Sequence, residues 1–417
     1  MDKLTREVGN WVTGDRFWDR ENELNNLIEL LNEGANVLVT GQRRMGKTSP
    51  LQETARRLQQ NGEYLCLYID VQKFDSPAEV IANICIAIRP HLNLWNQAKE
   101  IFRNVSSSAI NNIDTIAIDE LTINLRTGLA TSWQEKGDRI MDSLARSEKP
   151  VIIIIDEFPL FITRILKGPD YQITPERRLL TDIFTSWIRA ITIKYKGTLR
   201  LVLSGSIGLE PILRQARLSS NINTFMPFEV NEWDDETASG CLYALANKYE
   251  VIFKDNTVKL LLDLLGCNIP QHVQMFFSYL YDDCKHRENM NVSLEDIRRI
   301  YKNNMLSVRG HAELSTLEER LIMGLGKDIT PLAIDILTET AVTGELTATA
   351  IEILCSYSSL KNQELNDALR EILSIFEHDG YLRRKENGNY VFISKLIRDW
   401  WKERFSSQFI PAIKRKV

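Results

Sequence analysis

The stretch from Gly41 to Thr48 constrains the fold of this chain more than any other segment. Its letters, GQRRMGKT, fit the pattern G-x-x-x-x-G-K-[ST]. The apolar run Val37 to Val39 precedes it and is typical of a buried parallel strand. An amphipathic helical pattern follows and ends near Gly62, a plausible C-cap. A strand, a glycine-containing loop and a helix in this order predict a phosphate-binding loop in an α/β sheet.

The residues of this loop have separate predicted roles. Gly41 and Gly46 allow the backbone N–H groups to turn toward a phosphate, and the helix N-terminus adds its dipole. Lys47 is expected to reach the β- and γ-phosphates, and the Thr48 hydroxyl to bind Mg²⁺. Pro50 is expected to be harmless, because the first N–H groups of a helix have no intrahelical acceptor. The alternative is a chance glycine-rich turn. The residues expected to surround the nucleotide are Gly41, Gln42, Arg43, Arg44, Met45, Gly46, Lys47, Thr48 and Ser49.

A second apolar run ends in two acids. Val151 to Ile155 is continuously β-branched, as expected for a central strand that is covered on both faces. Asp156 and Glu157 follow at its carboxyl end, where ligands of open α/β sheets bind. We expect Asp156 to hold Mg²⁺ through water and Glu157 to polarise the attacking water. The alternative is a buried strand that is followed by two solvated acids.

A third apolar run, LRLVLSGSIG, ends in Ser204 and Ser206. One interpretation places a serine between the phosphate loop and the attacking water, as a sensor of the γ-phosphate. The other makes one serine the N-cap of the helix that follows. The sequence leaves both interpretations open.

Together these elements resemble the archaeal-type P-loop ATPases, within the AAA+/STAND assemblage. FWDRENEL is similar to the entry motif of this family, which helps hold the adenine and here supplies Phe17 and Arg20. GQRRMGKTS is similar to its double-arginine loop. IIIIDEFPLF, LSGSIGL and GCNIPQHVQ resemble its Walker B, sensor 1 and lid motifs. GYLRRKENGNYVFISKLIRDWW resembles its C-terminal winged-helix segment.

The resemblance implies an architecture. It implies an ASCE sheet of the α/β class, in which the Walker A and Walker B strands flank the sensor 1 strand. We expect a P-loop ATPase core over residues 1–232, a helical lid over 233–328 and a winged-helix domain over 329–417. The alternating pattern of NIDTIAIDELTINL predicts an inserted β-hairpin before the Walker B strand.

The resemblance also implies slow hydrolysis. The lid carries Pro270 where initiator-like members of the family carry an arginine, and STAND ATPases use such a proline to touch the base. Arg214 and Arg217 follow the third strand but do not match the pattern of an arginine finger. An arginine finger is worth about 10³-fold or more in rate. Its loss suits a nucleotide-held switch better than a motor.

The C-terminal segment has an uneven charge. Residues 381–417 contain ten Lys or Arg and three Asp or Glu, so this end is basic although the whole chain has a net charge of -5. Three helical patterns, two short strands around Asn387-Gly388 and a closing helix predict a winged helix. The helix before the hairpin is acidic and would be repelled by phosphates. The module is therefore either a regulatory, protein-docking domain or a non-specific DNA contact through the basic tail and Arg383, Arg384 and Lys385.

Composition limits the remaining classes. The six cysteines form no CxxC pair, which favours reduced thiols over disulfides or zinc. No signal peptide and no apolar run of about 18 residues is apparent, so we expect a cytoplasmic chain with no membrane partner.

The sequence therefore predicts an ATP-binding, slowly hydrolysing switch with ATP and Mg²⁺ as cofactors. No nuclease, peptidase or TIR-like motif is apparent, so a separate protein effector is the expected partner. The resemblance places such ATPases in defence or mobile-element systems. Two alternatives stay open: a DNA-binding initiator- or loader-like AAA+ ATPase, and a nucleotide-binding scaffold that hardly hydrolyses. Whether the chain forms a homo-oligomer also stays open.

Overall fold

The computed structural model describes residues 4–7, 9, 11–102, 129, 131–307 and 312–415. The chain forms two compact units. The sheet unit comprises Arg20–Thr40 and Lys47–Glu229. The helical unit comprises Met1–Asp19, Gly41–Gly46 and Val230–Val417. The hairpin predicted within residues 112–125 lies outside the described residues.

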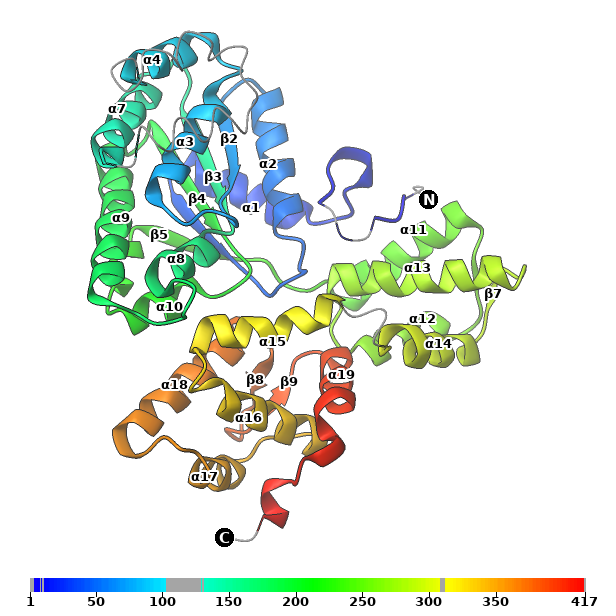
Figure 1. Cartoon of the computed structure of the whole chain (residues 1–417). Coiled ribbons are helices and arrows are strands. Elements are labelled where there is room, and N and C mark those ends of the chain that lie inside the picture. The colour runs from blue at the N-terminus through cyan, green and yellow to red at the C-terminus, as the bar shows by residue number, and fades with distance from the viewer. Residues whose placement is uncertain are drawn as a thin grey trace. The chain divides into compact units, whose positions relative to one another are not determined.

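The sheet unit contains five parallel strands in the order β2-β3-β4-β1-β5 (Figure 1). The strands are β1 Asn36–Thr40, β2 Leu65–Asp70, β3 Val151–Asp156, β4 Leu199–Ser204 and β5 Phe225–Glu229. The Walker A strand β1 and the Walker B strand β3 flank β4, so the expected sheet order is confirmed. Every residue of β3 and β4 is buried, as the uninterrupted apolar run of β3 predicts. In β4 the buried set includes Arg200, which donates to the carbonyl oxygen of Leu31.

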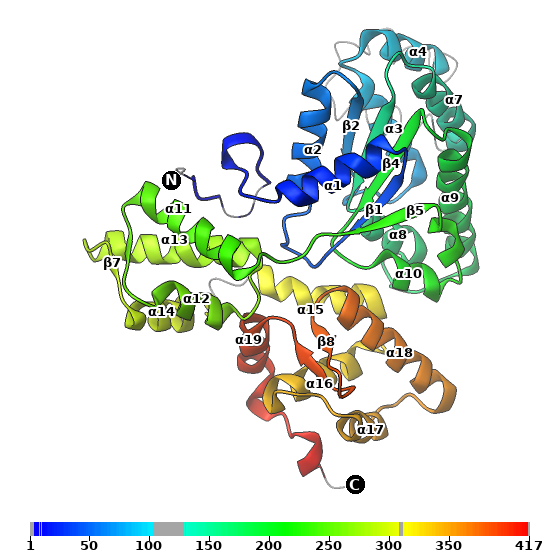
Figure 2. The same ribbon diagram turned by 180° about the vertical axis from the view of Figure 1, so that it is seen from behind.

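Helices cover both faces of this sheet (Figures 1 and 2). They are α1 Glu21–Asn32, α2 Thr48–Gln60, α3 Pro77–Ile88, α4 Leu92–Phe102, α7 Trp133–Ala145, α8 Phe158–Lys167, α9 Pro175–Lys194 and α10 Leu209–Gln215. On one side, Ile153 and Ile155 of β3 join a core with Phe158 and Phe184 from α8 and α9. On the other side, Arg57 of α2 pairs with Glu21 of α1 at 2.6 Å.

Residues 235–325 of the helical unit form a group of helices with two short strands. It comprises α11 Asp235–Tyr249, β6 Ile252–Phe253, α12 Thr257–Leu265, α13 Pro270–His286, β7 Asn291–Val292, α14 Leu294–Ile300 with the π-turn η3 Tyr301–Met305, and α15 Ala312–Leu325. The strands β6 and β7 form a short parallel pair. The helices predicted for the lid sequence are thus present.

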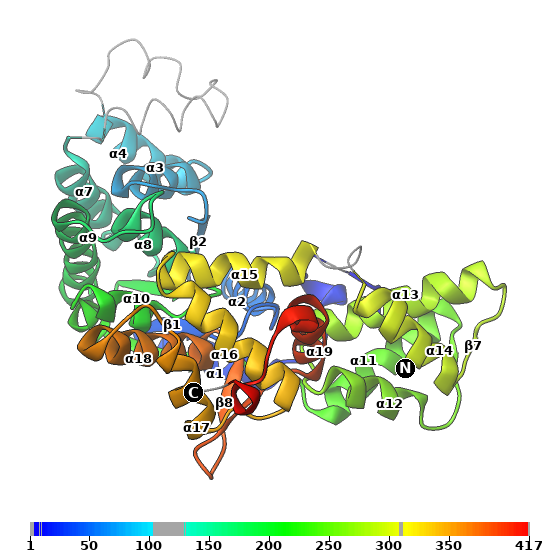
Figure 3. The ribbon, with the colours of Figure 1, turned by 60° about the horizontal axis from the view of Figure 1, so that its bottom comes forward.

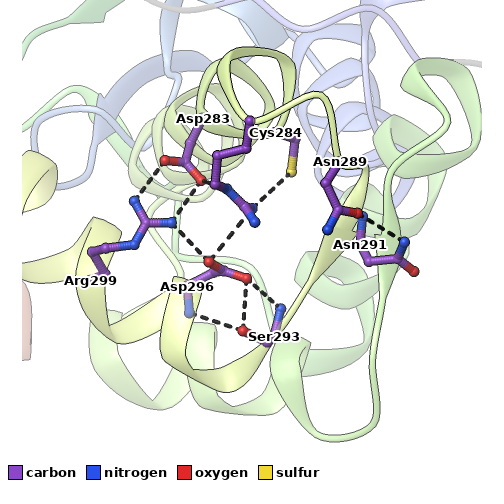
Figure 4. Close-up of polar contacts among 8 residues, drawn as sticks. Asp283, Cys284, Asn289, Asn291, Ser293, Asp296 and Arg299 are labelled. Carbon is purple, nitrogen blue, oxygen red and sulfur yellow. Dashed lines mark hydrogen bonds and ion pairs between the residues drawn. The ribbon is translucent and has the colours of Figure 1, made fainter.

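A cluster of two acids and two arginines joins α13 to α14 (Figure 4). Arg299 bonds Asp283 at 2.6 Å and Asp296 at 2.8 Å, and Arg287 bonds Asp283 at 2.7 Å. Hydrogen bonds from Arg299 hold the pKa of Asp283 below its usual value. Burial raises the pKa of Asp296, but bonds from Arg299 and Ser293 outweigh it and lower the value to about 2. We call these four residues the lid cluster.

The C-terminal module follows the order of elements that the sequence predicts (Figure 3). It consists of α16 Thr330–Thr343, α17 Ala348–Ser356, α18 Asn362–His378, β8 Leu382–Arg384, β9 Tyr390–Phe392 and α19 Lys395–Phe405. The strands β8 and β9 pair antiparallel. Trp400 and Trp401 are both buried, and Trp401 donates to the Thr338 hydroxyl at 3.1 Å. The tryptophans therefore belong to the core of the module.

Two further expectations concern the whole chain. All six cysteines are buried and unpaired with one another, as expected for reduced thiols. Burial raises the pKa of the Cys66 thiol to about 12. Among the described residues, no helix combines the length and the apolar character that a membrane crossing requires.

Candidate functional site

The loop between β1 and α2 depends on its two glycines. Gly41 has φ +146° and Gly46 has φ +76°, in the region that favours glycine. A Cβ on Gly41 would lie 2.4 Å from the carbonyl oxygen of Val230, so no larger residue fits there. Arg44 also has a positive φ, of 71°. The glycines that the motif requires are therefore required by the conformation of this loop.

Helix α2 begins directly after the loop. Lys47 is the N-cap residue and is buried, with 7% of its surface exposed. Thr48 is the first helical residue, and the helix continues through Pro50 without a break. Pro50 lies in the first turn, where no N–H group has an intrahelical acceptor, so the prediction that it is harmless is confirmed.

Asp156 stands at the carboxyl end of β3 and accepts hydrogen bonds from three hydroxyl groups. The Thr48 hydroxyl lies 2.9 Å from Oδ2, and the Tyr68 hydroxyl lies 2.6 Å from the same oxygen. Ser204 donates to Oδ1. The donors come from α2, β2 and β4, so three elements hold one carboxylate. The structure thus brings together Thr48 and Asp156, the two residues predicted to bind the metal.

Glu157 follows in the left-handed conformation, with φ 58°, and is the N-cap residue of α8. Its Oε2 accepts from the backbone N–H of Ser206 at 3.1 Å and from the Ser206 hydroxyl at 2.7 Å. Such strain in a non-glycine residue is frequent at functional sites. The bond to Ser206 fixes one oxygen of the predicted water-polarising carboxylate.

The two serines thus contact different acids, Ser204 contacting Asp156 and Ser206 contacting Glu157. Gly205 separates them, and a Cβ there would lie 2.2 Å from Cδ of Pro159 in α8. The alternative interpretation, in which a serine caps the next helix, is wrong, because the N-cap of α10 is Gly208. Their role as sensors of the γ-phosphate stays a prediction.

Two polar residues of β2 were missed at the sequence level. Burial and the nearby charge of Asp156 raise the pKa of the Tyr68 hydroxyl far above its usual value, so it stays a hydrogen-bond donor. Asp70 pairs in register with Asp156 across the β2–β3 ladder. Burial and the charge of Asp156 raise the pKa of Asp70. The signal was available, because Tyr68 and Asp70 lie at the end of the mainly apolar run LCLYID, which is typical of a strand.

The residues predicted to contact the adenine are divided between the two units. Phe17 is half-buried, and Pro270 is the buried first residue of α13, both in the helical unit. Arg20 belongs to the sheet unit, where it is buried and bonds Glu23 at 2.9 Å. Their joint contact with an adenine therefore stays a prediction. The remaining predicted basic residues, which are all exposed, are Arg214, Arg217, Arg383, Arg384 and Lys385.

The donor set suits a magnesium ion that arrives with a nucleotide. Among the described residues, no group of three or more His, Cys, Asp or Glu is placed to hold a metal by itself. Mg²⁺ commonly takes one or two protein oxygens and completes its shell with phosphates and water. The Thr48 hydroxyl and the Asp156 carboxylate, 2.9 Å apart, would supply such oxygens. When bound, the ion would neutralise developing charge on the β- and γ-phosphate oxygens.

Comparisons with known proteins agree with this geometry. Residues 17–217 match the model of an ATPase domain found predominantly in Archaea. The fold is similar to that of a Walker-type ATPase of Pyrococcus abyssi, with TM-score 0.62 and 15% identity over 95% of this chain and 99% of that one. It is also similar to the ORC2 protein of Aeropyrum pernix, solved in ADPNP–ADP complexes, with TM-score 0.51 and 13% identity over 93% and 95% of the chains. None of the curated proteins matches the sequence.

Proposed function

We propose that the chain is a slow, ATP-dependent switch, because residues 17–217 match the model of an ATPase domain found predominantly in Archaea. Its C-terminal winged-helix module would report the state of the bound nucleotide to a protein partner. The resemblance to STAND-type ATPases further suggests a defence or mobile-element system. The ATP-bound and ADP-bound states of the switch would differ in the contacts that the phosphate loop makes, because only ATP carries the γ-phosphate.

The residues at the carboxyl edge of the sheet suit hydrolysis. Lys47 would bind the β- and γ-phosphates, while Thr48 and Asp156 would orient the nucleotide through the metal. Ser206 occupies Oε2 of Glu157, which leaves Oε1 to accept a hydrogen bond from the attacking water. A carboxylate in this position aligns the water and receives its proton as the water attacks.

One contact supports the coupling between this loop and the module. Nε2 of Gln42 donates to the carbonyl oxygen of Gly380 at 2.7 Å, directly after α18. Gln42 is buried, with 9% of its surface exposed. Arg43 also donates to the Thr316 hydroxyl on α15. Gln42 and Arg43 of the phosphate loop are therefore bonded to the segment after α18 and to α15, so a nucleotide that rearranges the loop would disturb these bonds.

Gly380 offers a sharp test of the coupling. It has φ +76°, and a Cβ there would lie 2.4 Å from Cγ and Cδ of Gln42. Gly344, in the same module, has a similar φ of +88° with nothing within 4 Å, so Gly344→Ala is the matched control for backbone strain. We expect Gly380→Ala to speed ADP release and turnover about two- to tenfold, the equivalent of one lost hydrogen bond. Gly344→Ala is expected to leave both rates unchanged.

The assay is nucleotide release and steady-state turnover by the full chain, with Gln42→Ala as a second disrupting variant and Lys47→Ala as the binding-deficient reference. Equal rates for Gly380→Ala and Gly344→Ala would show that the module does not control the loop.

The second candidate function is a loader-like ATPase that grips DNA. The exposed Arg383, Arg384 and Lys385 on and beside β8 favour it, although the exposed face of α18 carries Glu364 and Asp367. Adding duplex DNA to the same turnover assay at low and physiological salt separates the two functions. Stimulation that fades with salt would support the loader, because phosphate contacts release counterions. ATP turnover that does not change when DNA is added would support the switch.

A further inference from the structure

Helix α9 carries an apolar stripe on its solvent-facing side. It runs along the outer side of the sheet unit (Figures 1 and 2). Between residues 179 and 193, the exposed positions are Leu179, Ile183, Ser186, Ala190 and Ile193. Leu179 and Ile193 expose 58% and 59% of their surfaces. The exposed side of a surface helix normally carries charged residues, and between residues 179 and 193 this side carries none, although Glu176, Arg178 and Lys194 are exposed at the two ends of α9. We call these five residues the α9 stripe.

The spacing of the α9 stripe is that of a helix-pairing seam. Successive members are separated by four, three, four and three positions. This alternation keeps the residues on one line along a helix and is the repeat by which helices pack against each other. The opposite side of α9 already packs into the core through Phe184, Trp187 and Ile188. The α9 stripe is therefore a second apolar surface, which lies outside the core of the sheet unit.

Two opposite charges lie along one edge of the stripe. Asp182 and Arg189 are both half-buried and are seven residues apart, so they share this edge. Oδ1 of Asp182 accepts from Asn221 at 3.0 Å, and Nε of Arg189 donates to Asn223 at 3.1 Å. These bonds restrain both side chains beside the stripe.

We propose that the α9 stripe pairs with the same stripe of a second copy of this chain, antiparallel about a twofold axis near Ser186. Leu179 then lies opposite Ile193 of the second copy, and Ile183 lies opposite Ala190. The offset along the helix axis within each pair is at most ~1.5 Å, the rise of one residue. On the charged edge, Asp182 lies opposite Arg189 of the second copy. The twofold axis repeats this opposite-charge pair, so one helix complements itself in both shape and charge.

The charges select this arrangement over its alternative. A parallel twofold pairing would place this edge on opposite sides of the interface in the two copies, so Asp182 and Arg189 would not meet. The antiparallel pairing is isologous, so two copies satisfy the interface and assembly stops at a dimer. The occupant of the stripe is therefore a second copy of this chain.

Sedimentation equilibrium of the full chain tests the apolar part. We expect a concentration-dependent dimer, and Ile193→Glu should raise its dissociation constant at least about tenfold. Leu92, the first residue of α4 in the same unit, is 73% exposed, so Leu92→Glu is the matched control and should leave the constant unchanged. Basal ATP turnover per chain should be unaffected by Ile193→Glu, which shows that this variant still folds.

Charge reversal tests the direction of pairing. Asp182→Arg and Arg189→Asp should each raise the dissociation constant about fivefold, and the double variant should restore it, because the opposite charges meet again. A wild-type chain that stays monomeric, or a dimer that persists in Ile193→Glu, would overturn the proposal. Failure of the double variant to rescue dimerisation would overturn the antiparallel arrangement.

Discussion

The acids at the edge of the sheet and the acids of the lid cluster belong to the same residue types but have different partners. At the sheet edge, Asp156 is bonded by the hydroxyls of Thr48, Tyr68 and Ser204. In the lid cluster, Asp283 and Asp296 are bonded by guanidinium groups (Figure 4). Hydroxyls are neutral, so they orient a carboxylate without cancelling its charge. Guanidinium groups supply the opposite charge within the protein.

This difference in hydrogen-bond partners indicates the role of each group of acids. A carboxylate that keeps its charge can still act on a metal or a water molecule. A carboxylate that is paired with arginines joins two helices and has little left to offer a ligand. We therefore expect loss of charge at the sheet edge to reduce activity, and loss of charge in the lid cluster to reduce stability. The predictions below test that division.

The largest effect is expected at Glu157. Glu157→Gln keeps the shape of the side chain but removes the charge that polarises water, so kcat should fall about 10²–10³-fold. ATP affinity and the thermal unfolding midpoint should change little. Rapid-quench measurement of phosphate release, together with binding of a fluorescent ATP analogue, measures both quantities.

Asp283→Asn is the counterpart of this substitution in the lid cluster. It should leave kcat within about twofold and lower local stability by about 1–3 kcal/mol, because Arg287 and Arg299 lose their shared acceptor. Hydrogen exchange in α13 and α14 reports this local stability. The division between the two groups of acids would be wrong if Glu157→Gln kept full activity, or if Asp283→Asn lost most of it.

The lid cluster should also make local stability depend on pH. The pKa of Asp296 is about 2 in the folded chain, against about 3.9 for an unperturbed aspartate. A depressed pKa stabilises the fold above the unfolded value, and this stabilisation is lost as pH falls from about 4 to about 2. At neutral pH it amounts to about 1–2 kcal/mol after solvent screening. Asp296→Asn should remove it.

Hydrogen exchange in α14 between pH 6 and pH 3 measures this dependence, after correction for the intrinsic exchange rate. The difference between the wild-type chain and Asp296→Asn should shrink as the acid is protonated. A constant difference over this range would show that the side chain stabilises the lid by packing and not by charge.

The sequence predicts the sheet edge well because chain connectivity fixes it. Strands β1, β3 and β4 are mainly apolar, and in a parallel sheet their carboxyl ends meet at one edge. Asp156 and Ser204 end β3 and β4, and Thr48 follows the loop after β1, so these three residues are close together in space.

The lid cluster and the Gln42–Gly380 bond could not be predicted in this way. Asp283 and Asp296 carry no motif, and their bonds depend on how α13 packs against α14. Gln42 and Gly380 are 338 positions apart, and no periodic pattern relates them. Tyr68 is an intermediate case, because the run LCLYID that contains it is typical of a strand but does not give the direction of its side chain.

The smallest effect is expected from two tyrosines that each donate to one aspartate. Tyr68 bonds Asp156 at 2.6 Å in the sheet unit, and Tyr301 bonds Asp399 at 2.9 Å in the helical unit. Each phenylalanine substitution removes one hydrogen bond, worth about 1 kcal/mol. If Asp156 acts on the metal, Tyr68→Phe should lower kcat about fivefold and raise the Mg²⁺ concentration that gives half-maximal turnover. Tyr301→Phe should lower the unfolding midpoint and leave the Mg²⁺ dependence unchanged. A Mg²⁺ titration of turnover for both variants separates the two roles, because a purely structural hydroxyl at Tyr68 would give the same Mg²⁺ dependence as Tyr301→Phe.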